Sequence, residues 1–351
     1  MNETDVNPVE YRLPADAAVS AIVDRVVLGD IKTLSRCISA IDDGDPVAAD
    51  VVDLLRQNAG RAMVIGLTGV PGAGKSTLIS SLAQRMAATG ARPAILAVDP
   101  SSPISGGALL GDRIRDGSDT KTIFFRSLAS RGSLGGLSPA LDDAVTLLDA
   151  AGHDVILVET VGAGQSDIAV THLVHTTLAV TAPGLGDEIQ AMKAGITEVA
   201  DLHVVNKQDA DPAGAEASAM VLRHRLGDGI HVAGLSDGPN AATADSPARW
   251  LTPVRVVSAR SGAGVEELLQ LIRAHRAFLE STGGLARWQR RRAIERYHQA
   301  VSTELRAHLS REWQDRVALD EAAVAEGRLT PHRAAQILVG EVLLKPPHRS
   351  K

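Results

Sequence analysis

The stretch Gly69-Val70-Pro71-Gly72-Ala73-Gly74-Lys75-Ser76 follows the pattern G-x-x-x-x-G-K-S and decides the fold of this 351-residue chain. An apolar run from Ala62 to Leu67 precedes it and predicts a buried strand, and the residues from Thr77 to Ala88 predict a helix. Glycines between a strand and a helix let several backbone N–H groups face one point, where the helix N-terminus adds its positive dipole. The stretch therefore predicts a phosphate-binding loop.

The side chains of this loop carry specific roles. In such a loop the lysine reaches the β- and γ-phosphates of a nucleotide, and the hydroxyl of the next residue binds Mg²⁺. We assign these roles to Lys75 and Ser76. Contacts to the nucleotide are expected from the whole segment, namely Gly69, Val70, Pro71, Gly72, Ala73, Gly74, Lys75, Ser76 and Thr77.

The composition excludes several other classes of function. The net charge of -6 argues against a protein that binds nucleic acid by bulk charge, and an aromatic content of 2% leaves few rings on which bases could stack. No apolar run reaches the ~18 residues that span a membrane. Cys37 is the single cysteine, which rules out an intrachain disulfide and fits a reducing compartment. The polar, acidic start of the chain does not read as a signal peptide, so we expect a cytoplasmic protein.

Hydrophobic patterning divides the chain into three expected parts. Residues 1–58 are expected to form an N-terminal helical extension, residues 59–278 a P-loop domain, and residues 279–351 a C-terminal helical arm. In the middle part strands alternate with helices, which predicts an α/β fold with a mostly parallel sheet covered on both faces. The expected strands are 63–67, 94–98, 122–125, 155–159, 177–180, 202–205 and 254–257.

The C-terminal part shows apolar residues at every fourth position. This stripe predicts a long helix that packs on its own domain or on a second copy of the protein. Its members are Tyr297, Val301, Leu305, Leu309, Trp313 and Val317.

A second motif identifies the base. Asn206-Lys207-Gln208-Asp209 follows the expected strand 202–205 and has the form N-K-x-D, with which many GTPases recognise guanine. The carboxylate of Asp209 would accept hydrogen bonds from the guanine N1–H and exocyclic amine, which adenine cannot supply. The stem of Lys207 would lie on the base, Asn206 would tie neighbouring loops together, and the later segment Ser258-Ala259-Arg260 would contact the guanine oxygen. We therefore expect GTP and its product GDP as ligands.

Three carboxylates are candidates for the Mg²⁺ site. Asp99 and Glu159 end expected strands, and Asp112 lies in a Gly-Asp-Arg segment. Strand ends next to the phosphate loop converge on one crevice in an open α/β sheet, and Mg²⁺ prefers oxygen ligands. One of the three could instead orient the attacking water. Gly162 would donate its backbone N–H to the γ-phosphate, which couples its loop to hydrolysis.

Longer motifs resemble one family. The chain resembles the methylmalonyl-CoA mutase-associated GTPases, the MeaB/MMAA family once described as ArgK-type, within the SIMIBI class of P-loop proteins. Besides 69–77, the resemblance rests on the segments 98–103, 106–113, 130–136, 159–166 and 183–195.

The resemblance implies a partner. It implies a GTP-hydrolysing chaperone that binds an adenosylcobalamin-dependent acyl-CoA mutase, methylmalonyl-CoA mutase in particular, and gates loading and protection of its cofactor. By the same resemblance Asp99, Asp112 and Glu159 surround Mg²⁺, the segment from Pro183 to Lys193 is a switch, and Lys193 takes part in partner-stimulated hydrolysis. With Lys75, Asp99 and Gly162, Lys193 completes the expected catalytic set. The terminal helices correspond to a dimerisation arm, which implies a homodimer.

Other functions remain open at this point. They are a kinase or transport ATPase of the ArgK type that acts on a binding protein, a nickel-insertion GTPase of the same class, and a nucleotide-switched scaffold. The N-K-Q-D motif argues against ATP, and the pair His172 and His175 has no nearby cysteine.

Overall fold

A computed structural model describes residues 16–99, 123–129, 139–160, 170–185, 198–226 and 249–344 of the chain. The chain forms two compact units, Met1–Trp288 and Gln289–Lys351. The expected boundaries at residues 58 and 278 stay a prediction. Within the described residues, no helix is long and apolar enough to cross a membrane.

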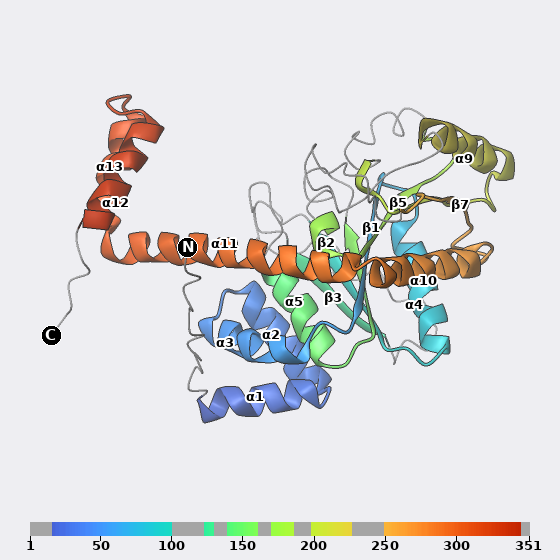
Figure 1. The fold of residues 1–351 in the computed structure, drawn as a ribbon, viewed down its shortest axis with the longest axis horizontal. Helices are drawn as coiled ribbons and strands as arrows, with labels where there is room; N and C mark the ends of the chain where they lie inside the picture. Colours follow the sequence, from blue (N-terminus) through green and yellow to red (C-terminus); the bar gives the residue numbers. More distant parts are fainter. Residues whose placement is uncertain are drawn as a thin grey trace, which may run out of the picture. The chain divides into compact units, whose positions relative to one another are not determined.

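The first unit is built on a seven-stranded sheet with the order β3-β2-β4-β1-β5-β6-β7 (Figure 1). Every neighbouring pair of strands is parallel, which confirms the α/β class. The strands are β1 (Met63–Gly69), β2 (Pro93–Asp99), β3 (Phe124–Ala129), β4 (Val155–Thr160), β5 (Thr176–Thr181), β6 (Leu202–Val205) and β7 (Val254–Val256).

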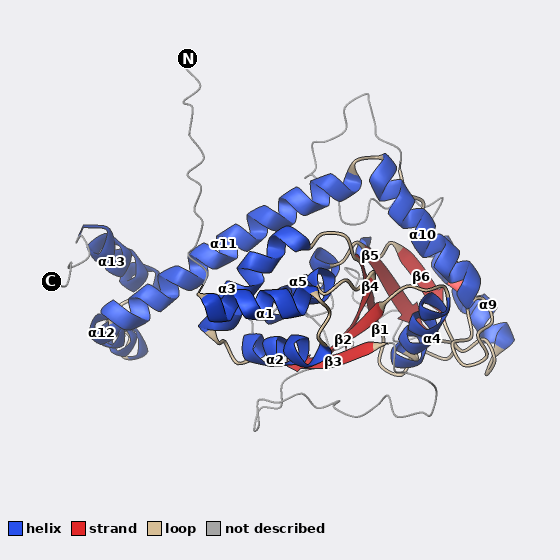
Figure 2. Ribbon diagram, turned by 90° about the horizontal axis from the view of Figure 1, so that it is seen from below, coloured by secondary structure: helices blue, strands red, loops and turns tan. Residues whose placement is uncertain are grey.

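Both faces of this sheet are apolar because its strands are largely continuous apolar runs, whose successive side chains point to opposite faces. Val64 and Ile65 of β1 show the alternation, since Val64 packs into one core and Ile65 into the other. The first core joins the sheet to α1, α2, α3 and α5, and the second joins it to α4 and α10. Figure 2 shows the strands between these two helical layers. The covering helices are α4 (Lys75–Ala88), α5 (Pro139–Ala150), α9 (Pro212–Leu226) and α10 (Val265–Ser281).

The edge strand β3 differs from the prediction. A strand was expected at 122–125, whereas β3 runs from Phe124 to Ala129 and includes Arg126 and Ser127. The apolar pattern stops at Arg126, but the backbone continues to pair with β2 as far as Ala129. The Arg126 guanidinium donates to the Ser39 hydroxyl of α2 at 2.7 Å, so an edge position and a polar partner accommodate the charge.

The three N-terminal helices begin in the same way. They are α1 (Ala17–Val27), α2 (Ile31–Asp42) and α3 (Pro46–Leu55), and an aspartate precedes each of them. The carboxylates of Asp16, Asp30 and Asp45 each accept a backbone N–H of the first turn. Such caps satisfy otherwise unpaired donors and contribute about 1 kcal/mol each. The helix starts are therefore determined locally.

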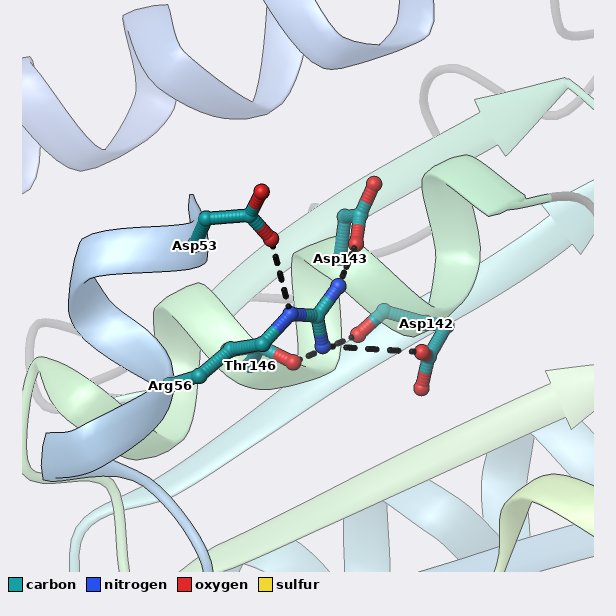
Figure 3. Close-up of polar contacts among 5 residues, drawn as sticks. All are labelled: Asp53, Arg56, Asp142, Asp143 and Thr146. Atoms are coloured by element: carbon teal, nitrogen blue, oxygen red, sulfur yellow. Dashed lines mark hydrogen bonds and ion pairs between the residues drawn. The ribbon is translucent and has the colours of Figure 1, made fainter. Parts of the chain in front are cut away.

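Two polar contacts attach these helices to α5. The Arg56 guanidinium, which follows α3, donates to Asp143 at 2.9 Å and to Asp53 at 3.1 Å, and it lies 3.9 Å from Asp142 (Figure 3). The buried carboxylate of Asp149 accepts the backbone N–H groups of Gly60, Arg61 and Ala62 at 2.6, 3.2 and 3.1 Å. Both contacts fix the segment that leads from α3 into β1, and hence the start of the central strand.

Helix α11 (Gly284–Glu312) begins in the first unit, and its residues from Gln289 onward belong to the second. The second unit also contains α12 (Gln314–Ala325) and α13 (Pro331–Leu344). The apolar stripe was expected to continue in one helix as far as Val317. The structure instead ends α11 at Glu312 and begins α12 at Gln314, with Trp313 between them at φ -126°. An apolar residue continues to occur at every fourth position across this break, so the periodicity alone does not reveal the end of the helix.

A buried histidine links β1 to β5. The ring Nδ1 of His175 accepts the backbone N–H of Val64 at 2.9 Å, and the backbone N–H of His175 donates to the Val64 oxygen at 2.8 Å. The ring packs on Trp288 with centroids 4.2 Å apart. Burial, with smaller effects of the charges of Arg276 and His275, lowers the pKa of His175 to about 3. The folded protein therefore holds this imidazole neutral.

We expect this histidine to make stability depend on pH. The pKa of an unfolded histidine is about 6.5, so between pH 7 and pH 5 the unfolded chain binds a proton that the folded chain does not. Folding stability should fall by about 2 kcal/mol over this range because of His175. Urea unfolding at the two pH values should show a smaller loss for His175→Gln than for wild type.

Replacement of the exposed His172 by glutamine supplies the control and should leave the pH dependence of stability as in wild type. An equal loss in His175→Gln and wild type would contradict the assignment.

Candidate functional site

Those predicted site residues that the structure describes lie at one edge of the sheet because all strands run parallel, which brings their carboxyl ends together. The loop 69–74 follows β1, and Glu159 lies near the end of the neighbouring β4. Asn206 follows β6, and Ser258 comes two residues after β7. Segments that are up to ~190 residues apart in sequence are thus gathered around one loop.

Two positions of the loop accept only glycine. Gly69 has φ +133°, and a Cβ there would lie 2.0 Å from the Val180 oxygen of β5. Gly74 has φ +85° and precedes α4 in the left-handed conformation. A Cβ on Gly74 would lie 2.5 Å from Nδ2 of Asn206. Close approach of the loop to β5 and to the N-K-Q-D segment therefore requires glycine at both positions.

The other loop residues divide by burial. Val70 and Ala73 pack into the core below the loop, whereas Pro71, Gly72 and Thr77 are exposed. The side chains of Val70 and Ala73 anchor the loop, and the backbone between them faces outward.

The side chain of Lys75 folds back over the loop. Lys75 is 6% exposed, and its Nζ donates to the carbonyl oxygens of Gly69 at 2.8 Å and Val70 at 3.1 Å. These bonds hold a positive charge above the loop backbone, at the N-terminus of α4. A concentrated positive field results, of the kind that attracts phosphate.

Ser76 and Glu159 form the acidic side of the site. The Ser76 hydroxyl donates to Oε1 of Glu159 at 2.6 Å, so a hydroxyl oxygen and a carboxylate lie side by side next to the lysine. Both are oxygen donors of the kind that Mg²⁺ prefers, and the donor set therefore fits this ion. Among the described residues, no group of three or more His, Cys, Asp or Glu side chains could hold a metal.

Asn206 connects the motifs. Its Nδ2 donates to the Ala73 oxygen at 2.9 Å and to the Gly74 oxygen at 3.3 Å, and its Oδ1 accepts the backbone N–H of Ala259 at 2.9 Å. The side chain is 2% exposed. One carboxamide thus joins the phosphate loop to the 258–260 segment, as the sequence predicted for a residue that ties loops together.

The rest of the N-K-Q-D segment is shaped by backbone strain. Lys207 is the only described residue other than glycine with positive φ, at +64°. Its Cε would lie 3.9 Å from a Cβ placed on Gly74, so its stem runs beside the phosphate loop. A left-handed lysine costs roughly 1–3 kcal/mol. The surrounding bonds, including the backbone N–H of Gln208 on the Val257 oxygen at 3.1 Å, hold it there.

Asp209 is held by a side chain that the sequence analysis did not foresee. The Ser258 hydroxyl donates to Oδ1 of Asp209 at 2.6 Å and accepts the backbone N–H of Ser261 at 3.1 Å. This bond is the main reason why the pKa of Asp209 is lowered, and the charges of Arg260 and Lys207 act in the same direction. The sequence pointed only to a backbone role for this segment; a serine next to a predicted guanine motif was the available signal.

Four predicted residues are incompletely described. The backbone of Asp99 ends β2, at the same edge of the sheet as Glu159. Asp112, Gly162 and Lys193 lie outside the described residues, as does most of the expected switch between Pro183 and Lys193.

Comparison with known proteins identifies the relatives. The family model described as "Methylmalonyl Co-A mutase-associated GTPase MeaB" matches residues 34–314. The chain is 30% identical to GTPase ArgK of Escherichia coli over 300 residues, which is 84% of this chain and 87% of that protein. It is 31% identical to the mitochondrial methylmalonic aciduria type A homolog of Mus musculus over 341 residues, which is 90% of this chain and 79% of that protein.

A solved structure supports the fold. A structure described as LAO/AO transport system kinase superposes with a TM-score of 0.65 at 23% identity, covering 95% of this chain and 100% of that one. At this identity the likeness shows that the fold is shared.

We expect Asn206 to control both stability and nucleotide binding. Asn206→Asp keeps the acceptor for Ala259 but places a carboxylate against two carbonyl oxygens. Loss of buried donors costs about 1–3 kcal/mol, so the unfolding free energy should fall by about 2 kcal/mol and affinity for a fluorescent GTP analogue at least about tenfold. Gln208→Ala, which changes the neighbouring variable position, should change neither quantity appreciably. Wild-type affinity in Asn206→Asp would refute the role.

Proposed function

The chain belongs to the family of methylmalonyl-CoA mutase-associated GTPases, and from this premise we propose that it is a GTP-hydrolysing chaperone of an adenosylcobalamin-dependent acyl-CoA mutase. It binds GTP and hydrolyses it to GDP and phosphate, as its family shows. The finer proposal is that it binds methylmalonyl-CoA mutase itself and gates cofactor loading and protection in the cytoplasm. The observation that supports the mutase partner is the match of residues 34–314 to the family model, and the Asn206 carboxamide, which joins the phosphate loop to the guanine segments, supports the nucleotide site.

Guanine selectivity is assigned to Asp209. The hydrogen bond from Ser258 and the nearby positive charges keep its carboxylate ionised. A carboxylate has about four lone-pair positions, so one bond from Ser258 leaves enough acceptors for the guanine N1–H and exocyclic amine. Lys207 flanks the base, and the backbone of 258–260, held by Asn206 through Ala259, meets the guanine oxygen.

Phosphate binding is assigned to the loop and to Lys75. When a triphosphate binds, the Lys75 ammonium would replace its bonds to carbonyl oxygens by bonds to phosphate oxygens. The ammonium therefore already lies close to the position in which it would bind phosphate. Ser76 and Glu159 would hold Mg²⁺, with Asp99 and Asp112 as further candidates, and the bound ion would neutralise phosphate charge. Gly162 would donate its backbone N–H to the γ-phosphate, and Lys193 would take part in hydrolysis stimulated by the partner.

The second unit is proposed to make a homodimer. Four apolar side chains of α11 are exposed, namely Ile294 (49%), Tyr297 (65%), Val301 (39%) and Leu305 (55%). Contact with a second copy would remove this apolar surface from water.

Base selectivity can be inverted at one residue. Asp209→Asn replaces an acceptor by a donor opposite the guanine amine, so kcat/KM for GTP should fall at least about a hundredfold while that for xanthosine triphosphate rises. Steady-state hydrolysis of both nucleotides measures this. Asp211→Asn alters an exposed carboxylate nearby and should keep the preference for GTP. Retained GTP selectivity in Asp209→Asn would rule out the assignment.

The chaperone proposal is tested with the partner. Addition of adenosylcobalamin-dependent methylmalonyl-CoA mutase should speed GTP hydrolysis, and the affinity of the complex should differ between GDP and a non-hydrolysable GTP analogue. Lys75→Ala removes the phosphate-binding cation and should abolish both the turnover and the nucleotide dependence. If the mutase neither binds nor stimulates, the GTPase assignment stands and the chaperone proposal fails.

A further inference from the structure

A cavity of about 270 Å³ lies among α1, α2 and α3, and none of its lining residues belongs to the nucleotide site. This volume is close to the lower end of the ~300–1,000 Å³ of ligand pockets, which is enough for a small organic molecule. The GTPase assignment gives this cavity no role.

The inner wall is apolar. Cys37 of α2 and Ala48 and Val51 of α3 line the cavity and are buried, and Ile22 of α1 adds a partly buried wall. Burial raises the pKa of the Cys37 thiol, so it stays protonated and behaves as a small apolar group. A hydrocarbon chain is the chemistry that this wall accommodates.

The rim carries two arginines with unused donors. Arg25 of α1 and Arg36 of α2 line the cavity with exposed side chains, and in the described part of the chain neither guanidinium makes a hydrogen bond or an ion pair. Arg25 acts on Asp30 only as a nearby charge. The acid of the rim, Asp45, already accepts the backbone N–H of Val47 at 2.9 Å. The rim therefore offers guanidinium donors to an anion.

We propose that this cavity binds a small amphipathic carboxylate. The apolar chain lies against Cys37, Ala48 and Val51, and the carboxylate lies between Arg25 and Arg36. A guanidinium matches a carboxylate with two parallel hydrogen bonds, so the pair recognises the head group by geometry as well as by charge. The cavity volume limits the chain to a short one.

Binding of hexanoate to the full-length protein tests the proposal, with hexylammonium and hexanol as probes of equal chain length. Calorimetric titration should show saturable binding of hexanoate, weaker binding of hexanol and none of hexylammonium. Because Cys37 is the only cysteine, the rate of its reaction with a thiol reagent reports on this cavity alone, and hexanoate should slow that reaction. Equal affinity for hexanoate and hexanol, or no binding of hexanoate, overturns the proposal.

Variants at the rim separate charge recognition from packing. Arg25→Gln combined with Arg36→Gln should weaken hexanoate binding at least about tenfold, because each arginine supplies charge-assisted hydrogen bonds, and should leave hexanol binding unchanged. Both side chains are exposed, so the variant should keep the wild-type melting temperature and GTP turnover. Arg255→Gln on the far edge strand β7 is the matched control. Unaltered hexanoate affinity in the double variant refutes the assignment.

Discussion

The nucleotide site depends on one buried carboxamide. Asn206 donates to the phosphate loop and accepts from Ala259, so a single planar group sets the distance between this loop and the 258–260 segment proposed to meet the base. Gly74 is required because a side chain there would occupy the place of this carboxamide.

That contact is possible because the sheet is parallel. The loop follows β1 and Asn206 follows β6, with β5 between them, and all three strands end at the same edge. The apolar faces of the sheet are both covered by helices, which leaves this edge as the place where polar side chains can gather. The same geometry places Glu159 beside Ser76 from the other neighbour of β1. The groups proposed to bind phosphate, metal and base thus all lie at or near strand ends.

Much of the fold was predictable, and the failures have physical causes. Six of the seven strands fall within about two residues of expectation because buried strands are continuous apolar runs. The strand β3 was misplaced because an edge strand tolerates Arg126 once Ser39 accepts its charge-assisted hydrogen bond. The break at Trp313 was missed because apolar spacing continues through it. Within the site, the roles of Ser258 and the left-handed backbone of Lys207 depend on neighbours distant in sequence, which no local pattern records.

The sequence by itself determined the phosphate loop, the guanine motif and the family, since each motif depends on residues that are close in the chain. Tertiary structure alone decided which distant groups meet: Ser76 with Glu159, Asp209 with Ser258, and Asn206 with both Gly74 and Ala259. It also decided that Arg25 and Arg36 border one cavity above a buried thiol. The physical reason is that periodicity and turn chemistry act over a few residues, whereas contacts between loops follow from the order of strands in the sheet and from helix packing.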